Sequence, residues 1–244
     1  MGTGLGGGDG YRAGVGTSDP TTTPGDGEGP VWCVVVAAGS GRRFGGAKQF
    51  AELAGRRVLD RSVATAAEVC DGVVVVLAPD VVDSPEGRVP GATAVVAGGA
   101  TRTESGRAGL AAVPPEAEVV LVHDAARPLA DAALFTRVID AVRGGAAAVV
   151  PVVAVTDTVR DVGGAPVDRE RLRAVQTPQG FDAAVLRAAM ASGAEATDDA
   201  GLVEAAGGRV TFVEGDPSNR KLTTPEDLLV ARALLAGRDE AVTA

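Results

Sequence analysis

The chain has 244 residues, of which 45% are hydrophobic, and its formal net charge at pH 7 is −9. This length suits one domain with a sizeable core, or two small domains. The acidic balance argues against nonspecific binding to nucleic acid or to anionic membranes, because both require a broad basic surface.

The first 30 residues are rich in Gly, Thr, Pro and Asp, a composition that cannot bury a core. We predict a disordered tail over residues 1–30 and a folded domain over residues 31–244. The start of the chain lacks the pattern of a signal peptide, and no apolar stretch approaches the ~20 residues of a membrane span. Cys33 and Cys70 lie in apolar stretches without metal-ligand spacing, which predicts buried free thiols in a reducing compartment. We therefore expect a cytoplasmic protein.

From Val31 onward, runs of β-branched residues alternate with stretches whose apolar residues recur at helical spacing. The runs predict strands over 31–36, 72–78, 93–97, 118–123, 146–153 and 209–215. The other stretches predict helices over 58–69, 102–113, 131–142, 182–190 and 198–206. A last helix begins at "TTPEDL", where Thr224 can cap, Pro225 suits the first turn and Asp227 has the position of a capping-box acid.

These strands are apolar on both faces and are separated by helices. The pattern indicates a doubly wound α/β fold, in which helices cover both faces of a mostly parallel sheet. In such folds ligands bind beyond the carboxyl ends of the strands, so we expect the functional residues directly after strands.

Residues 157–175 break this alternation. They predict a short hairpin that projects from the sheet, with Gly163 and Gly164 in its turn. Because an isolated hairpin is marginally stable in water, such an arm needs a surface on which to rest. We therefore predict a homodimer in which an arm of about residues 155–175 reaches over the neighbouring subunit.

The first strand leads into "AAGSGRRFGGAKQ", residues 37–49, which resembles two common nucleotide-binding loops without matching either. A dinucleotide fingerprint needs a third glycine one residue earlier than Gly45, and an acidic residue much sooner after the loop than Asp80. A Walker loop fails because Ala47 separates Gly46 from Lys48, and because Gln49 replaces the Ser or Thr that binds magnesium.

A third interpretation fits the loop better. Glycines after a strand let backbone N–H groups approach phosphate oxygens, and Arg42, Arg43 and Lys48 can surround a polyphosphate. The alternative, in which the arginines are solvated loop charges, stays open at this point.

Taken together, the loop and six later motifs resemble the 2-C-methyl-D-erythritol 4-phosphate cytidylyltransferases of the non-mevalonate isoprenoid pathway. The later motifs are "GGATRTES", "VHDAARP", "TDT", "DRERLRAVQTPQGF", "TDDA" and "NRKLTTPEDL", in the family's order. The resemblance covers Val31 to about Leu235. The chain departs from the family at Ala47, where proline is usual, and at Gly201, where serine is common. Its arm and its loop before Lys48 are also short.

The resemblance implies that a polyol phosphate, 2-C-methyl-D-erythritol 4-phosphate, attacks the α-phosphorus of CTP and releases pyrophosphate. It also implies Mg²⁺, bound mainly through the CTP phosphates, and we assign no protein ligand to a metal. Three alternatives remain: a cytidylyltransferase for another polyol phosphate such as ribitol 5-phosphate, a sugar-1-phosphate nucleotidyltransferase, and a nucleotide-binding regulatory module without turnover.

The resemblance also implies roles for individual residues. The catalytic set is Arg43, Lys48, Arg169 and Lys221. The CTP-binding set is Ala37, Ala38, Gly39, Ser40, Gly41, Gly98, Ser105 and Asp124. The polyol-binding set is Asp124, Arg127, Thr158, Arg169, Thr177 and Lys221. A strand-end Asp124 could bind a substrate hydroxyl or a metal, and Ser105 could instead be a plain helix cap. We assign no role to His123, Arg171 or Arg173.

Overall fold

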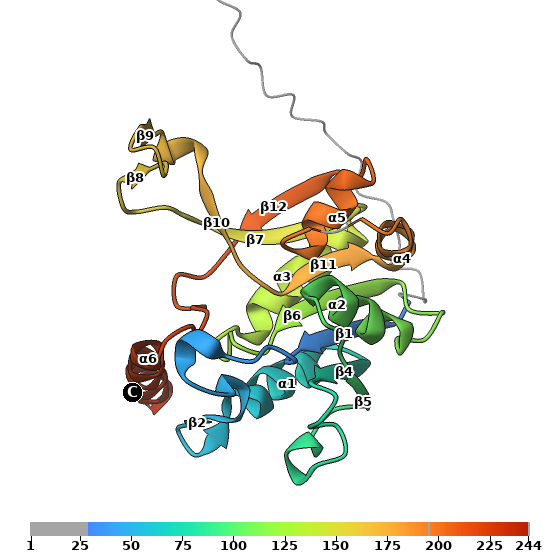
Figure 1. Cartoon of the computed structure of the whole chain (residues 1–244), viewed down its shortest axis with the longest axis horizontal. Coiled ribbons are helices and arrows are strands. Elements are labelled where there is room, and N and C mark those ends of the chain that lie inside the picture. Colours follow the sequence, from blue (N-terminus) through green and yellow to red (C-terminus); the bar gives the residue numbers. More distant parts are fainter. Residues whose placement is uncertain (1–28, 195, 244) are drawn as a thin grey trace, which may run out of the picture.

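The computed structural model describes residues 29–194 and 196–243. The predicted tail therefore lies almost wholly outside the described residues. An eight-stranded sheet forms the centre of the described part, in the order β10-β7-β11-β6-β1-β4-β5, with β12 also paired to β7 (Figure 1). The strands are β1 (Val31–Val36), β4 (Gly72–Leu77), β5 (Ala94–Ala97), β6 (Val119–Asp124), β7 (Ala148–Ala154), β10 (Arg173–Val175), β11 (Gln179–Asp182) and β12 (Val210–Glu214).

Most of this sheet is parallel, as the alternation of strands and helices predicts. β1 pairs in parallel with β4 and β6, β4 with β5, and β12 with β7. β10 and β11 run antiparallel to their neighbours. The α/β fold class is thereby confirmed, and all six predicted strands are present.

Helices cover both faces of the sheet. α1 (Val58–Val69) and α3 (Ala132–Arg143) pack on one face, where Leu59, Val63 and Phe135 contact the buried side chains of the strands. α2 (Arg102–Ala111), α4 (Ala183–Ala191) and α5 (Asp199–Ala205) pack on the other face. α6 (Pro225–Thr243) lies beside the edge of the molecule and closes a small third cluster with Leu53 and Leu222 (Figure 1). None of the described helices has the length and apolar character needed to cross a bilayer.

Side-chain caps begin several of these helices where the sequence places acidic or hydroxyl residues. The side chains of Asp131, Asp182 and Asp198 accept hydrogen bonds from the first turns of α3, α4 and α5. At α6, Pro225 is the first residue, and the Asp227 carboxylate accepts the backbone N–H of Thr224 at 2.9 Å. The Asp227 part of the predicted capping arrangement is thus present, whereas the Thr224 hydroxyl donates to the Asp227 carboxylate at 3.4 Å.

The sequence analysis missed strand β11. Its residues, Gln179–Asp182, lack the run of β-branched side chains that marks the other strands, yet they pair with both β6 and β7. Gly180 permits this placement, because a Cβ atom at that position would lie 2.4 Å from Cγ1 of Val138 on α3. A tertiary contact with α3, and not local propensity, therefore selects the residue in the middle of this strand.

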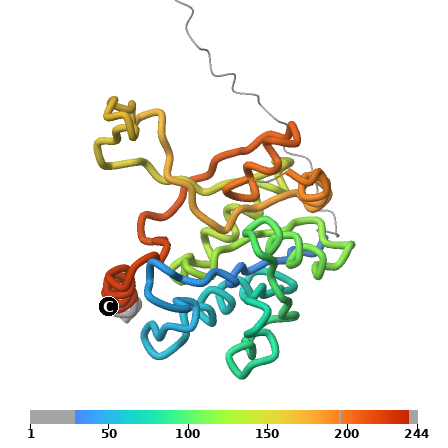
Figure 2. The backbone as a smooth tube through the Cα atoms, in the orientation of Figure 1, coloured from blue at the N-terminus to red at the C-terminus, as the bar shows by residue number. Residues whose placement is uncertain are grey.

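The predicted arm is present and leaves the body of the molecule (Figures 1 and 2). β8 (Val159–Arg160) and β9 (Pro166–Val167) pair antiparallel at its tip, and Gly164 in the turn has a positive φ of 88°. After the short 3-10 helix η4 (Arg169–Arg171), the chain returns as β10 to the edge of β7.

The remaining elements are short. They are the 3-10 helices η1 (Arg42–Phe44), η2 (Lys48–Phe50) and η3 (Pro85–Gly87), and the hairpin of β2 (Glu52–Leu53) with β3 (Arg56–Arg57). The first two of these helices belong to the loop after β1, where they position the cations discussed below.

Candidate functional site

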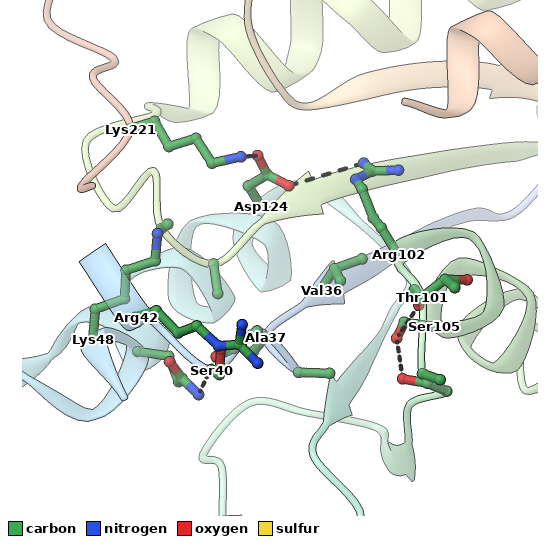
Figure 3. A pocket seen from close by; sticks show the side chains of 17 residues that line it. Val36, Ala37, Ser40, Arg42, Lys48, Thr101, Arg102, Ser105, Asp124 and Lys221 are labelled. Atoms are coloured by element: carbon green, nitrogen blue, oxygen red, sulfur yellow. Dashed lines mark hydrogen bonds and ion pairs between the residues drawn. The ribbon is translucent and has the colours of Figure 1, made fainter. Parts of the chain in front are cut away.

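A cleft of about 520 Å³ opens beyond the carboxyl ends of β1 and β6 (Figure 3). Its walls come from the loop after β1, the start of α2, the end of β6 and the segment before α6. The predicted residues that line it are Ala37, Ala38, Gly39, Ser40, Lys48, Ser105, Asp124 and Lys221. The structure therefore brings together, at one edge of the sheet, motifs that lie far apart in the sequence.

The backbone of the loop after β1 is folded back on itself. Gly41 has φ of 63°, and a Cβ atom there would lie 1.9 Å from the carbonyl oxygen of Gly46, so only glycine fits this position. The Gln49 side chain donates to the carbonyl oxygen of Gly39 at 3.4 Å. Ala47, where the family usually has proline, has φ of −72°, a value that proline also adopts. With alanine at position 47, the φ angle before Lys48 is therefore one that proline would also have.

Lys48 connects this loop to the segment before α6. Its ammonium group donates to the carbonyl oxygen of Leu222 at 2.7 Å, across 174 positions of sequence. Burial lowers the pKa of Lys48, and the nearby positive charges of Lys221 and Arg43 lower it further against the attraction of Asp124. Lys48 is consequently a half-buried cation among other cations, an environment that favours the binding of an anion.

Asp124, at the end of β6, lies between two cations (Figure 3). Its Oδ2 atom is 2.7 Å from Nζ of Lys221, and its Oδ1 atom is 3.9 Å from the guanidinium of Arg102. Burial alone would raise the pKa of this carboxyl, but Lys221 and Arg102 outweigh burial and hold the pKa below its ordinary value. Asp124 is therefore an ionised acceptor in the cleft at neutral pH.

Thr177 contacts the backbone of Asp124 at the end of β6. It is buried, and its Oγ1 atom accepts the backbone N–H of Asp124 at 3.0 Å. The same oxygen lies 3.1 Å from Nδ1 of His123, which is fully buried with a pKa lowered to about 4, chiefly by burial. Thr177 thus supports Asp124 from behind, and it does not line any of the cavities described here.

Ser105 lines the cleft, whereas Gly98 does not line it and packs directly behind Ser105 and Ala38. A Cβ atom on Gly98 would lie 2.7 Å from Oγ of Ser105 and 2.8 Å from Cβ of Ala38. Ser105 is in the second turn of α2, where its hydroxyl donates to the carbonyl oxygen of Thr101 at 2.9 Å. The helix cap is Thr101, in a capping box with Glu104, so the interpretation of Ser105 as the cap is wrong.

Two smaller cavities adjoin the cleft and share its cations. One, of about 350 Å³, is lined by Gly41, Arg43, Lys48 and Thr223. The other, of about 260 Å³, is lined by Arg127 and Lys221 among others. Arg127 is itself tied to the backbone, since it donates to the carbonyl oxygens of Asn219 at 2.9 Å and Val175 at 3.0 Å.

Two of the predicted residues lie away from these cavities. Thr158 and Arg169 are exposed on the arm, where the Arg169 guanidinium donates to the carbonyl oxygen of Thr156 and pairs with Glu170 at 3.5 Å. Neither residue lines the cleft or the two smaller cavities. Their placement in a partner's site stays a prediction.

The structure adds Arg102, which had no role predicted from the sequence, and places Arg42 of the loop in the same cleft. Arg102 lies within "GGATRTES", a motif that was recognised without a role for its arginine. The partner of Arg102 is Asp199, 97 positions away, at 2.7 Å. No local pattern signals so distant an ion pair, although the "TDDA" motif marks its location.

Cys33 is buried and Cys70 is partly buried, and both are free thiols. Among the described residues, no three His, Cys, Asp or Glu side chains are grouped so that they could hold a metal ion.

Comparisons with known proteins point to one enzyme family. The profile of the family "IspD: 2-C-methyl-D-erythritol 4-phosphate cytidylyltransferase" matches residues 31–237. The protein of that name from Rhodococcus jostii (strain RHA1) is 49% identical over 220 residues, which cover 86% of this chain and 97% of that protein. The corresponding match from Nocardia farcinica (strain IFM 10152) is 47% identical over 224 residues, covering 87% of this chain and 97% of that protein.

A solved structure shows the same fold. The crystal structure of 2-C-methyl-D-erythritol 4-phosphate cytidylyltransferase from Thermus thermophilus aligns with a TM-score of 0.72 at 37% identity, covering 83% of this chain and 98% of that one. The match of the family profile, the relatives at 47–49% identity and the cleft geometry lead to one conclusion. This chain belongs to the 2-C-methyl-D-erythritol 4-phosphate cytidylyltransferase family.

Proposed function

We propose that this chain transfers CMP from CTP to 2-C-methyl-D-erythritol 4-phosphate, forming 4-diphosphocytidyl-2-C-methyl-D-erythritol and pyrophosphate for isoprenoid precursor synthesis. The observation that carries the proposal is the position of Lys48 and Lys221. Lys48 is shared by the cleft and the cavity beside Arg43, and Lys221 is shared by the cleft and the cavity beside Arg127. Two anionic substrates can therefore meet between two cations.

The nucleotide occupies the cleft. Small residues in its wall, among them Ala38, Gly39 and Ser105, leave room for a base that is held by backbone hydrogen bonds and by few side chains. The triphosphate lies along the loop after β1, where Arg42, Arg43 and Lys48 offset its charge. We expect Mg²⁺ to be held mainly by the CTP phosphates, where it would offset part of their negative charge.

The polyol phosphate approaches from the side of the cavity beside Arg127. Its phosphate is largely dianionic near neutral pH, since the second pKa of a phosphate monoester is about 6, so no protein base is needed to create the nucleophile. Lys221 attracts that phosphate, and Asp124 accepts hydrogen bonds from the polyol hydroxyls. Catalysis then depends on alignment of the two substrates and on the stabilisation of charge at the α-phosphorus by Arg43 and Lys48.

The active form is a homodimer. The hairpin of the arm has strands of two residues each, which are too short to be stable without a supporting surface. Val162, at the tip of the arm, is fully exposed in the single chain. An arm that rests on the partner would carry Thr158 and Arg169 towards the partner's polyol site, where Arg169 would orient the attacking phosphate. A cytoplasmic location is consistent with the two free thiols.

Release of pyrophosphate from CTP and Mg²⁺ in the presence of each polyol phosphate tests the proposal. We expect turnover with 2-C-methyl-D-erythritol 4-phosphate, and a kcat/KM for ribitol 5-phosphate that is lower by up to ~10⁴, because a longer chain misplaces one hydroxyl or the phosphate. A higher kcat/KM for ribitol 5-phosphate would contradict the assignment. Absence of turnover with every polyol phosphate, although CTP binds, would instead favour a regulatory nucleotide-binding module.

A further inference from the structure

Arg102, the first residue of α2, lines the cleft (Figure 3). A second acid, Asp199, holds its guanidinium in place. One terminal nitrogen of its guanidinium is 2.7 Å from Oδ2 of Asp199, and the other is 3.9 Å from Oδ1 of Asp124. The guanidinium therefore bridges the start of α5 and the end of β6. The side chain of Arg102 is 29% exposed, and that of Asp199 is completely buried.

Asp199 does not cap its own helix. The cap of α5 is Asp198, whose carboxylate accepts the backbone N–H of Gly201 at 3.0 Å. The Oδ1 atom of Asp199 is buried without a hydrogen-bond partner among the described residues, and Oδ2 contacts Arg102. A buried ion pair contributes little to stability in comparison with apolar packing, so stability alone does not account for this pair.

A glycine on α2 leaves room for the Asp199 carboxylate beside Arg102. Gly106, one turn after Arg102 on α2, faces Asp199, and a Cβ atom there would lie 3.2 Å from Oδ1 of Asp199. α2 and α5 therefore approach each other closely where the carboxylate is placed. This close approach fixes the direction from which Asp199 holds the guanidinium.

We infer that Arg102, held in place by Asp199, is a positioning residue that fixes the orientation and the charge of Asp124 in the cleft. Lys221 holds the Oδ2 atom of Asp124 from one side, Arg102 faces Oδ1 from the other, and Thr177 accepts the Asp124 backbone N–H. Because both carboxylate oxygens are held by these cations, their remaining lone pairs can accept hydrogen bonds from substrate hydroxyls. This inference extends the proposed function and rests on it for the role of Asp124.

Several charged groups besides Arg102 affect the ionisation of Asp124. Lys221, Arg102 and Arg127 favour its ionised form, as does Lys48 at longer range. Asp199 opposes ionisation, and the buried His123 is neutral at pH 7. Loss of Arg102 leaves the other cations in place but leaves Asp199 without its counter-charge, so both changes raise the pKa of Asp124.

The first experiment needs no substrate. The carboxyl carbon of Asp124 is followed by NMR as a function of pH in the full chain, with Asp124→Asn used to assign the resonance. We expect Arg102→Gln to raise the apparent pKa of Asp124 by about 1. Arg107→Gln is the matched control, because Arg107 lies on the same helix but binds the carbonyl oxygens of Met190 and Ala194. It should leave the titration unchanged.

The second experiment is the pH dependence of kcat/KM with CTP and 2-C-methyl-D-erythritol 4-phosphate. In Arg102→Gln the acid limb should stay in place, because the substrate phosphate with its pKa of about 6 dominates it. The value of kcat/KM at pH 7 should fall about tenfold because Asp124 loses its fixed orientation, and Arg102→Lys should recover part of the loss. In Asp199→Asn, the further effect of Arg102→Gln should be smaller than in the natural chain, because Asp199 acts through Arg102.

An unchanged Asp124 titration in folded Arg102→Gln, or an equal change in Arg107→Gln, overturns the inference. If Arg102→Gln does not fold, the titration is followed in Arg102→Lys and Asp199→Asn. An unchanged apparent pKa of Asp124 in both variants would also overturn the inference. The two failures can be told apart. If the proposed function is wrong, the natural chain shows no turnover, but Arg102→Gln still shifts the NMR titration of Asp124 as expected.

Discussion

Lys48 illustrates how single residues in this site have two tasks. Its ammonium group faces the cleft, and the same group donates to the carbonyl oxygen of Leu222, the residue after Lys221. The loop after β1 and the segment before α6 are thereby held together at the point where the two substrates meet. A change at Lys48 is expected to affect both the local charge and the position of Lys221.

For Lys48→Ala we expect kcat to fall by ~10²–10³, the scale of a lost electrostatic stabiliser, while the Kd for CTP rises much less. The reason is that charge builds up at the α-phosphorus in the transition state and not in the bound nucleotide. Single-turnover kinetics and direct binding of CTP measure the two effects. Arg56→Ala is the control, since it removes an exposed positive charge from β3 and should change neither value.

Equal losses in binding and turnover would contradict this prediction, because they would mean that Lys48 only clamps the ground state. Lys48→Arg adds a check on the contact with Leu222. It keeps the charge and a donor but alters the shape, so a large loss of kcat there would indicate that placement matters as much as charge.

At the scale of elements, the arm is the part of the molecule that its own chain supports least. Its tip is held by the pairs Val159–Val167 and Arg160–Pro166, and its base by the pairing of β10 with β7. The rest of the arm leaves the sheet, as Figures 1 and 2 show. In the proposed dimer the partner would supply a surface for the arm, which carries Arg169 away from the cleft of its own chain.

Mixing inactive Lys48→Ala subunits with inactive Arg169→Ala subunits should restore activity. If the arm crosses to the partner, one site in each mixed dimer contains both native residues, and random exchange gives about a quarter of the natural activity. Steady-state pyrophosphate release after subunit exchange measures the recovery. Arg171→Ala, which removes a neighbouring charge of the arm, should be active on its own.

The recovery distinguishes two arrangements of the arm. No recovery in a mixed dimer that has been verified by native mass spectrometry would place Arg169 in the site of its own subunit. A chain that stays monomeric at the assay concentration and is fully active would contradict the dimer itself.

For the whole molecule, the single histidine of the chain couples stability to pH. His123 is fully buried against Phe135, with ring centroids 5.1 Å apart, and burial is the main cause of its lowered pKa of about 4. In the unfolded chain an ordinary histidine has a pKa of about 6.5. The unfolded state therefore takes up the proton first as the pH falls, and the folded state loses stability between pH 6.5 and pH 4.

We expect this group to remove about 2–3 kcal/mol from the free energy of unfolding between pH 7.5 and pH 4.5. Urea unfolding of the natural chain and of His123→Gln at both pH values measures it, since the variant keeps the losses from the carboxyl groups and lacks the histidine contribution. The natural chain should therefore lose about 2–3 kcal/mol more than the variant between pH 7.5 and pH 4.5. A difference that is independent of pH would contradict the prediction.

Much of this architecture could be predicted from the sequence. The predicted strands and helices are present because each has a strong local pattern, in which apolar residues alternate or recur at helical spacing and helices begin at capping residues. The cluster of Gly39, Lys48 and Asp124 could be predicted as well, because residues that follow parallel strands meet at one edge of the sheet. The motifs of the family pointed to Lys221, although its segment follows no strand directly.

Other features were decided by the tertiary structure. β11 exists because Gly180 fits beneath α3 between two strands, although its own sequence has weak strand propensity. The contacts of Asp199 with Arg102 and of Lys48 with Leu222 join residues 97 and 174 positions apart. The sequence by itself determined most of the helices and strands and where they end, because those interactions act over a few neighbouring residues. Tertiary packing decided which charges face one another, because ion pairs depend on distance in space and leave no periodic pattern in the chain.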